Sequence, residues 1–351
     1  MKRLLVAMLA LSMLIGATAI IAGCGTDDAE ETGFEWRYQV AFEEADMEYQ
    51  ALEPFVEAVE EESDGELTIN AYPSGQIVPP AEQLEAVSMG TIDASHSFPP
   101  YYRGQVPVAD IDSGLPGQYP GFGTLDDAMH MLYEYEDGAL SDVFREAYDD
   151  QADAYYLGSH SVHGYPALIS TEPLTEVEDF QGQIIRATGT YGDLMEALGA
   201  SATDVDGGEI YSEVELGTLD ALTWSIEMFL AYNLYEVAEY VHVPPVSGHA
   251  MSHVVINHES WEALPADLQE VVEEAYHEVY IPELFNLYEE EWAEVEDKQD
   301  EYGYEILEID DLIDEKREIA MEEIWPEVAA QDEYTEEAME IVESWHEEHG
   351  E

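Results

Sequence analysis

Two stretches of this 351-residue chain repeat one pattern: VSMGTIDA at residues 87–94 and VELGTLDA at residues 214–221. In each, a helical pattern stops at a glycine and a short strand pattern follows. Glycine ends many helices, so one such echo is weak evidence for duplication. It nevertheless suggests two similar α/β lobes, and a chain of this length is longer than a single core usually organises.

The residues around the first stretch extend the pattern in both directions. Residues 34–42 and 67–72 alternate as strands do, and residues 44–63 and 80–89 have helical periodicity, with Gly90 ending the second helix. A further strand begins directly afterwards. This β-α-β-α-β order predicts a parallel sheet with helices on its faces.

The later half of the chain completes the predicted architecture. We expect lobe I to comprise residues 34–158 together with about 252–280, and lobe II to comprise residues 159–251. A strand at residues 253–257 would return the chain to lobe I. Residues 281–351 form a helical C-terminal region that either braces the two lobes or mediates a homodimer.

The charge of the chain is extreme. It carries 81 Asp and Glu against nine Lys and Arg, for a formal net charge of −72, yet 46% of its residues are apolar. The apolar content is sufficient for folded cores, so the chain is not a disordered acidic tail. The charge indicates a surface adapted to high salt, as in a salt-adapted bacterium, and argues against nucleic acid and anionic membrane surfaces as partners.

The N-terminus reads as a targeting segment. Lys2 and Arg3 precede an apolar run at residues 4–21, which ends just before Cys24, the one cysteine of the sequence. The segment resembles a bacterial lipoprotein signal peptide at residues 1–23, with lipid on Cys24. An acidic tether at residues 24–33 would follow. A transmembrane anchor is the alternative, and both interpretations place the body outside the cytoplasmic membrane.

Arg186 is the main candidate for ligand binding. It follows an apolar pair in a chain that has few cations. A guanidinium can hold a carboxylate through two parallel hydrogen bonds, which makes arginine the side chain best suited to an organic acid. The alternative is a structural ion pair with one of the many carboxylates.

Several motifs in one order resemble the substrate-binding proteins of TRAP (tripartite ATP-independent periplasmic) transporters, over roughly residues 36–304. The resemblance is closest to the branch that binds 2-oxo acids and lactate. It is carried by YPSGQIVP at 72–79, QLEAV at 83–87, GTID at 90–93, FQGQIIR at 180–186, GGEIY at 207–211, GTLDA at 217–221, Trp224, and WEALPADLQ at 261–269.

The resemblance implies an α/β, two-lobed, periplasmic-binding-protein-like fold with a ligand cleft between the lobes. In that family an arginine at the position of Arg186 pairs with the ligand carboxylate. Tyr101 corresponds to a tyrosine that donates a second hydrogen bond, although it could equally be an interface aromatic. Trp224 falls where the branch has a tryptophan.

This branch often holds a metal ion beside the ligand, through a glutamine and an acidic residue. Here those positions are His163 and Thr223, which weakens the case for a Ca²⁺ or Na⁺ site, so we expect neither metal nor cofactor. Both residues remain candidates for ligand contact, as does His96. Five histidines fall at predicted lobe edges and are expected to hydrogen-bond ligand or backbone rather than a transition metal: His96, His160, His163, His249 and His253.

The sequence therefore predicts an extracytoplasmic, lipid-anchored solute-binding protein that delivers an organic carboxylate to TRAP permease subunits. A sensor of the same fold, with a non-carboxylate or zwitterionic ligand, is the alternative. A secreted hydrolase is disfavoured, because the sequence contains no phosphate-binding glycine loop and no nucleophile elbow.

Overall fold

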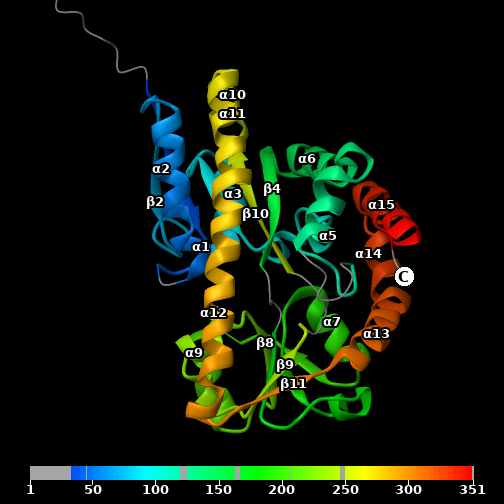
Figure 1. Ribbon diagram of the computed structural model, residues 1–351. Helices are drawn as coiled ribbons and strands as arrows, with labels where there is room; N and C mark the ends of the chain where they lie inside the picture. The colour runs from blue at the N-terminus through cyan, green and yellow to red at the C-terminus, as the bar shows by residue number, and fades with distance from the viewer. Residues whose placement is uncertain are drawn as a thin grey trace, which may run out of the picture. The chain divides into compact units, whose positions relative to one another are not determined.

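Two β-sheets organise the chain from Gly33 onward (Figure 1). The computed structural model describes residues 33–44, 46–118, 125–162, 167–205, 207–245 and 250–349. The first sheet has the order β2 (Leu67–Tyr72), β1 (Phe34–Val40), β3 (Ala94–Ser97), β10 (Ala250–Asn257) and β4 (Ala154–Val162). The second has the order β11 (Glu305–Glu308), β9 (Tyr240–Val243), β5 (Ala167–Ser170), β8 (Ala221–Trp224), β6 (Ile184–Arg186) and β7 (Ser201–Thr203).

Helices separate and cover these strands. Around the first sheet they are α1 (Met47–Gln50), α2 (Leu52–Glu62), α3 (Gln83–Ser88), α4 (Ala109–Asp112), α5 (Leu125–Met129), α6 (Ala139–Ala152), α10 (His258–Ala263) and α11 (Ala266–Ala275). Between the strands of the second sheet they are α7 (Gly189–Ala197), α8 (Ile210–Glu215) and α9 (Glu227–Ala231). The C-terminal helices are α12 (Ile281–Tyr302), α13 (Asp310–Ile319), α14 (Trp325–Ala329) and α15 (Glu333–His349). Short 3-10 and π segments are η1 (Pro80–Glu82), η2 (Pro99–Tyr102), η3 (His130–Glu134), η4 (Tyr135–Asp137), η5 (Val177–Phe180), η6 (Gly207–Glu209), η7 (Leu234–Glu236), η8 (Tyr276–Tyr280) and η9 (Ala320–Ile324).

The two sheets share one topology. In the first, β1 is parallel to both β2 and β3, and β10 adds antiparallel to β3. In the second, β6 is parallel to both β7 and β8, and β5 adds antiparallel to β8. Each β-α-β-α-β unit is therefore parallel, as the sequence pattern of the first lobe predicts. Each sheet as a whole is mixed, because the strands beyond that unit, β10 and β5, enter in the opposite direction.

The repeated sequence pattern occupies equivalent places in the two lobes. Gly90 follows α3 and has a φ of +65°, and Gly217 follows α8 and has a φ of +69°. A side chain is disfavoured in this left-handed conformation, which lets both helices end and both chains turn into β3 and β8. The prediction of two similar α/β lobes is confirmed.

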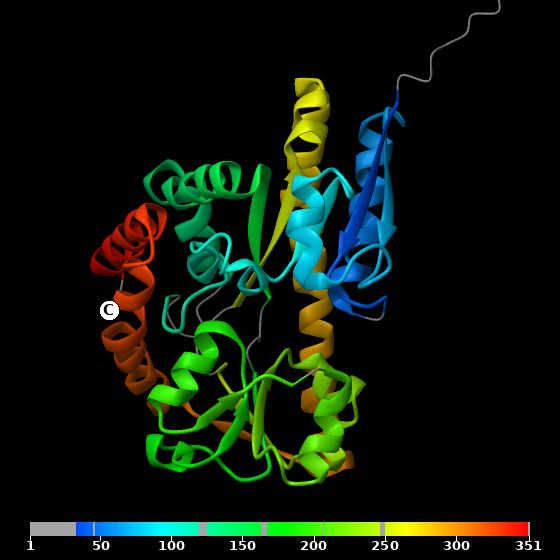
Figure 2. The same cartoon turned by 180° about the vertical axis from the view of Figure 1, so that it is seen from behind.

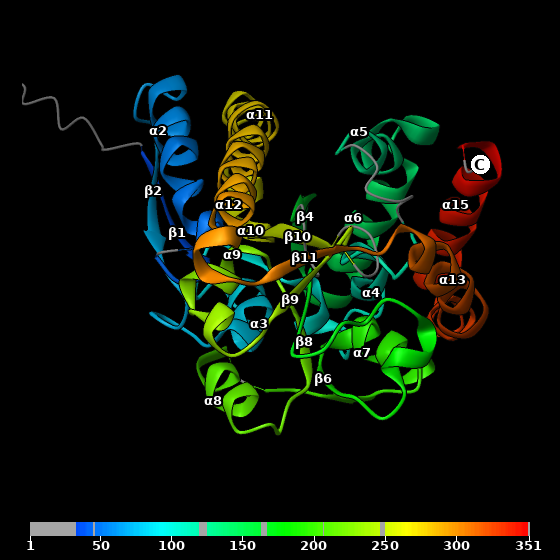
Figure 3. The same ribbon diagram turned by 60° about the horizontal axis from the view of Figure 1, so that its bottom comes forward.

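Several segments join the lobes. The chain enters the second sheet after β4 and returns to the first after β9. Helix α12 contacts α1 and β4 of the first lobe and α9 and β11 of the second (Figure 1). The chain then crosses the second lobe through β11 to α13 (Figure 3). Helix α13 packs on α7, while α15 packs on α4 and α6, so the C-terminal helices contact both lobes (Figure 2).

Apolar side chains fill both faces of each sheet. Neighbours along a strand point to opposite faces, and Val255 and Ile256 of β10 accordingly belong to different buried clusters. Leu168 and Ile169 of β5 divide in the same way. Of the helices in the described ranges, none combines the length and the apolar character required to cross a bilayer.

Candidate functional site

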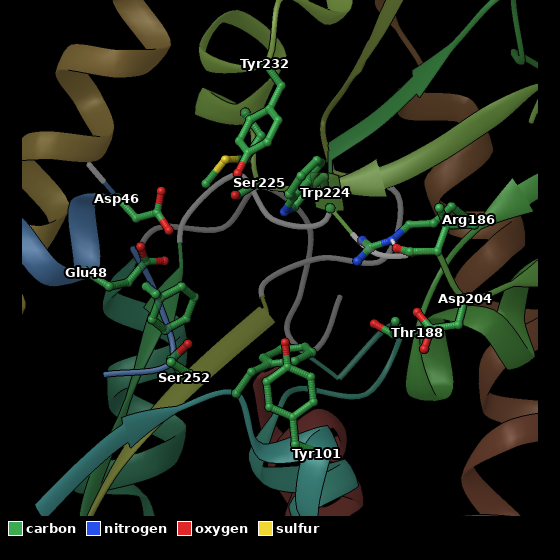
Figure 4. A pocket seen from close by; sticks show the side chains of 16 residues that line it. Asp46, Glu48, Tyr101, Arg186, Thr188, Asp204, Trp224, Ser225, Tyr232 and Ser252 are labelled. Carbon is green, nitrogen blue, oxygen red and sulfur yellow. Dashed lines mark hydrogen bonds between the residues drawn. The ribbon is translucent and has the colours of Figure 1, made fainter. Parts of the chain in front are cut away.

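A cavity of about 290 Å³ lies where strands of both sheets end (Figure 4). Open α/β sheets bind ligands at the carboxyl ends of their strands, where the following loops leave a crevice. The lining follows this rule in both lobes: Ala41 and Phe42 follow β1, Phe98 follows β3, Arg186 ends β6, Asp204 and Val205 follow β7, and Trp224 and Ser225 lie at the end of β8. The remaining lining residues are Asp46, Glu48, Tyr101, Thr188, Gly207, Met228, Tyr232 and Ser252.

Arg186 is fixed at the cavity by neutral groups. Its Nη1 donates to the carbonyl oxygen of Thr223 at 2.8 Å, and its Nε donates to that of Val205 at 3.4 Å. The guanidinium carbon lies 5.4 Å from the centroid of the Trp224 ring. None of the ion pairs formed between residues in the described ranges includes Arg186. Its orientation is therefore set by carbonyls and an aromatic ring, which leave its charge available to an anion.

The other predicted site residues fall into three groups. Tyr101 and Trp224 line the same cavity as Arg186, and Tyr101 is 48% exposed. Thr223 is buried behind the cavity, where its main-chain oxygen holds Arg186. His96 is also fully buried and is not part of the lining. His163 and Cys24 lie outside the described residues, as does His249.

His96 belongs to a buried chain of hydrogen bonds beneath the cavity. Its Nε2 lies 3.1 Å from Nε2 of His160, and its Nδ1 lies 2.7 Å from the hydroxyl of Tyr280. Tyr276 extends the chain to Nδ1 of His160 at 2.8 Å, and Tyr280 donates to the main-chain oxygen of Glu48 at 3.1 Å. Burial lowers the pKa of His160 to about 3 and lowers that of His96 well below its ordinary value, so both rings are neutral.

One proton arrangement satisfies this chain throughout. Tyr276 donates to His160, His160 donates to His96, His96 donates to Tyr280, and Tyr280 donates to the carbonyl of Glu48. The network is thus a structural support that fixes the backbone of α1 at the edge of the cavity. The role that the structure gives His96 is to hold Glu48 in place.

The side of the cavity opposite Arg186 is acidic (Figure 4). Asp46 and Glu48 face it from the first lobe, and Glu227 of α9 lies close enough to raise the pKa of Glu48. Burial, and then the charge of Glu227, raise the pKa of Glu48 well above its ordinary value. Burial likewise raises the pKa of Asp46, and that of Glu227 to about 7. Three carboxyl groups thus share a poorly solvated region.

Sequence reasoning did not find these three acids. With 81 acidic residues in the chain, a carboxylate carries little information by type. The available signal lay in the helical pattern, because Glu48 falls on the buried face of α1 beside Met47. A buried acid is an exception among the many exposed acids of this chain, and at a cavity it indicates a candidate site.

No group of three or more His, Cys, Asp or Glu side chains in the described ranges has an arrangement suited to a metal ion. Asp46, Glu48 and Glu227 therefore do not form such a group.

Comparisons with known proteins give a consistent family assignment. Residues 39–332 match the family described as bacterial extracellular solute-binding protein, family 7 (DctP). The chain is 24% identical over 253 residues to a monocarboxylate 2-oxoacid-binding periplasmic protein of Nostoc sp., a match that covers 68% of this chain and 64% of that protein, so the chain spans less than two-thirds of that relative. It is 26% identical over 268 residues to the ectoine/5-hydroxyectoine-binding periplasmic protein UehA of Ruegeria pomeroyi, covering 74% of each.

The fold has close counterparts among solved structures. A TRAP periplasmic solute-binding protein from Pseudoalteromonas atlantica, with bound sodium and pyruvate, aligns with a TM-score of 0.77 at 22% identity, covering 90% of this chain and 94% of that chain. This similarity supports the two-lobed fold, whereas the ligand class depends on the residues that line the cavity.

Proposed function

Because this chain belongs to the family 7 bacterial extracellular solute-binding proteins, the ligand-capturing components of TRAP transporters, we propose that it captures a small organic carboxylate for sodium-coupled uptake. Its family and fold are those of binding proteins, not of enzymes. The observation that carries the proposal is Arg186, whose guanidinium is oriented by two carbonyls at the cavity between the lobes. A carboxylate entering the cavity would complete its coordination.

The ligand class in this proposal is a 2-oxo acid, a hydroxy acid or a dicarboxylate. The cavity of about 290 Å³ is at the small end of the range for ligand pockets, which supports a compact solute. A solute sensor of the same fold, with a non-carboxylate or zwitterionic ligand, is the second candidate. Asp46 and Glu48 are the observation that favours a zwitterion, because both carboxyl groups line the cavity.

The proposal includes an extracytoplasmic location, with a lipid on Cys24 after removal of residues 1–23, and a partnership with the membrane permease subunits. Labelling with radioactive palmitate in cells tests the anchor, since Cys24→Ala should abolish incorporation. Incorporation that persists in that variant would contradict it.

A thermal-shift screen of the purified protein in molar salt tests the proposed function. The panel contains monocarboxylates, 2-oxo acids, hydroxy acids, dicarboxylates, amino acids and uncharged sugars. A true ligand stabilises the folded state increasingly with concentration, as mass action requires. Stabilisation by one class of acid supports the proposal, whereas stabilisation by sugars alone would contradict it.

The formal charge of −72 also predicts a strong dependence of stability on salt. We expect the free energy of unfolding to rise as NaCl increases, because the screening length falls from about 10 Å at 0.1 M to about 3 Å at 1 M. Urea denaturation at a series of NaCl concentrations measures this dependence.

A charge-reduced variant provides the control for that experiment. Four exposed glutamates on α15 can be changed together to glutamine: Glu336, Glu337, Glu340 and Glu343. The variant should be more stable than the parent at low salt and should gain less from added NaCl. Equal salt dependence in the two proteins would show that self-repulsion is not the cause.

A further inference from the structure

The cavity has two chemically different sides. Arg186 lies on one side together with Asp204, and Asp46 and Glu48 lie on the opposite side (Figure 4). A ligand whose one polar group is a carboxylate would pair with Arg186 and would give Asp46 and Glu48 no partner. The acidic side therefore indicates which second functional group the ligand contains.

Glu48 is the informative residue on that side. Its side chain is buried, with a residue exposure of 2%, and it lines the cavity. Its Oε2 has no hydrogen-bond partner among the described residues. A buried carboxyl oxygen without a donor is costly, and most such atoms in folded proteins are satisfied. The unsatisfied atom points to a donor that arrives with the ligand.

The ionisable groups close to Glu48 are acidic or phenolic, and the buried hydroxyl of Ser252, which also lacks a partner among the described residues, lines the cavity with it (Figure 4). Asp46 lies at the start of the same helix, α1, and Glu227 faces it from α9 of the other lobe. Tyr288 and Glu291 approach Glu227 from α12, and Tyr280 of η8 donates to the main-chain oxygen of Glu48. None of the ion pairs within the described ranges supplies a cation to Asp46, Glu48 or Glu227.

Aromatic rings complete the acidic side. Phe42 and Tyr232 line the cavity with Asp46 and Glu48, and the Tyr232 ring lies 4.9 Å from that of Trp224. Aromatic faces attract cations, most strongly where water is excluded. Carboxyl groups together with aromatic rings are therefore a surrounding suited to a cation.

We propose that the acidic side of the cavity binds a positively charged N–H group, so that the ligand is a small zwitterion whose carboxylate pairs with Arg186. This inference rests on the proposed function, since it takes the Arg186 side as the carboxylate site. The unpartnered oxygen of Glu48 selects an N–H cation over a quaternary ammonium group, because only the former donates a hydrogen bond.

A dicarboxylate is the main competitor for the same space. Its second carboxylate would meet Asp46 and Glu48, which line the cavity close to Glu227, and these groups would have to be protonated to avoid repulsion. Asp46 is the least buried of the three, so it is the hardest to keep neutral. The geometry therefore favours a cation.

The two ligand types differ in their proton linkage. In the unliganded protein, burial raises the pKa values of Glu48 and Glu227, the latter to about 7. A bound cation favours the ionised carboxylates, so binding releases protons and affinity rises as pH rises through about 7. A dicarboxylate requires protonated acids, so its affinity would fall over the same range.

Isothermal titration calorimetry with matched ligands tests the inference. One series keeps a four-carbon acid and changes its far end: γ-aminobutyrate, its trimethylated form, succinate and butyrate. Parallel series use a shorter chain, from β-alanine, and a five-membered ring, from proline. We expect the tightest ligand to be an N–H zwitterion, about tenfold or more tighter than its apolar and dicarboxylate counterparts.

Glu48→Gln isolates the acidic side. It keeps the size of the side chain and removes its charge, so zwitterion affinity should fall about tenfold or more and keep only the pH dependence that Glu227 contributes, while butyrate-type ligands change little. Glu60→Gln removes the same charge from an exposed position of α2 and should leave all affinities unchanged. Thermal unfolding of both variants confirms that they are folded.

The outcomes separate this inference from the function on which it rests. Tightest binding by a dicarboxylate or an apolar monocarboxylate would overturn the zwitterion and leave the carboxylate proposal intact. Preference for the trimethylated ligand would overturn the N–H donor. Failure of every carboxylate in all series would overturn both proposals.

Discussion

Arg186→Ala is expected to weaken binding of the carboxylate ligand by about 2 kcal/mol or more, which is over tenfold in affinity. In the parent protein the guanidinium is held by carbonyls of Thr223 and Val205, and it is partly buried at the cavity. Its removal would leave the ligand's charge without a partner in a poorly solvated space. Calorimetric titration of parent and variant measures the difference.

Two further variants test whether the loss of affinity is specific to the guanidinium of Arg186. Arg186→Lys keeps the charge and loses the two-pronged geometry, so it should recover only part of the affinity. Arg145→Ala removes a partly exposed arginine that pairs with Asp142 and should bind like the parent. Unchanged affinity in Arg186→Ala would assign this arginine a purely structural role.

Asp112→Ala is expected to lower the free energy of unfolding by about 3–5 kcal/mol. This carboxylate is fully buried in the first lobe and accepts hydrogen bonds from Tyr148 and Tyr156, each at 3.0 Å, and from Ser159. His253 lies 2.7 Å from it through Nδ1. Truncation would leave four buried donors without an acceptor. Urea denaturation in molar salt measures the loss.

The matched control for Asp112 is an exposed acid. The side chain of Asp142 is 67% exposed and forms an ion pair with Arg145 on the surface of α6, so Asp142→Ala should cost about 0.5 kcal/mol or less. Asp112→Asn, which keeps one acceptor oxygen, should fall between the two. A loss for Asp112→Ala as small as that for Asp142→Ala would mean that the network contributes little to stability.

The sequence predicts much of this fold because local signals agree with the tertiary structure. Gly90 and Gly217 end equivalent helices, and each has a positive φ. The repeated sequence pattern around them therefore predicted two similar lobes. The strand at the end of the second lobe's sequence returns to the first sheet as β10, as predicted. The antiparallel direction of β10 could not be predicted from the sequence, because strand direction depends on where the chain re-enters the sheet.

The candidate site was only half predictable. Arg186 could be found because cations are rare in this chain, and Trp224 because the TRAP substrate-binding proteins that the sequence resembles have a tryptophan at that position. Asp46, Glu48 and Glu227 come from α1 and α9, which are distant in sequence, and they meet only in the folded protein. Glu48 differs from the acids of the surface in being buried, not in its residue type.

A ligand-bound crystal structure grown in molar salt is the most direct test of the account. It should show a ligand carboxylate in the cavity between the lobes, with its oxygens about 2.7–2.9 Å from guanidinium nitrogens of Arg186. A bound ligand without an acid group, or a carboxylate bound elsewhere with Arg186 still held only by Thr223 and Val205, would contradict it.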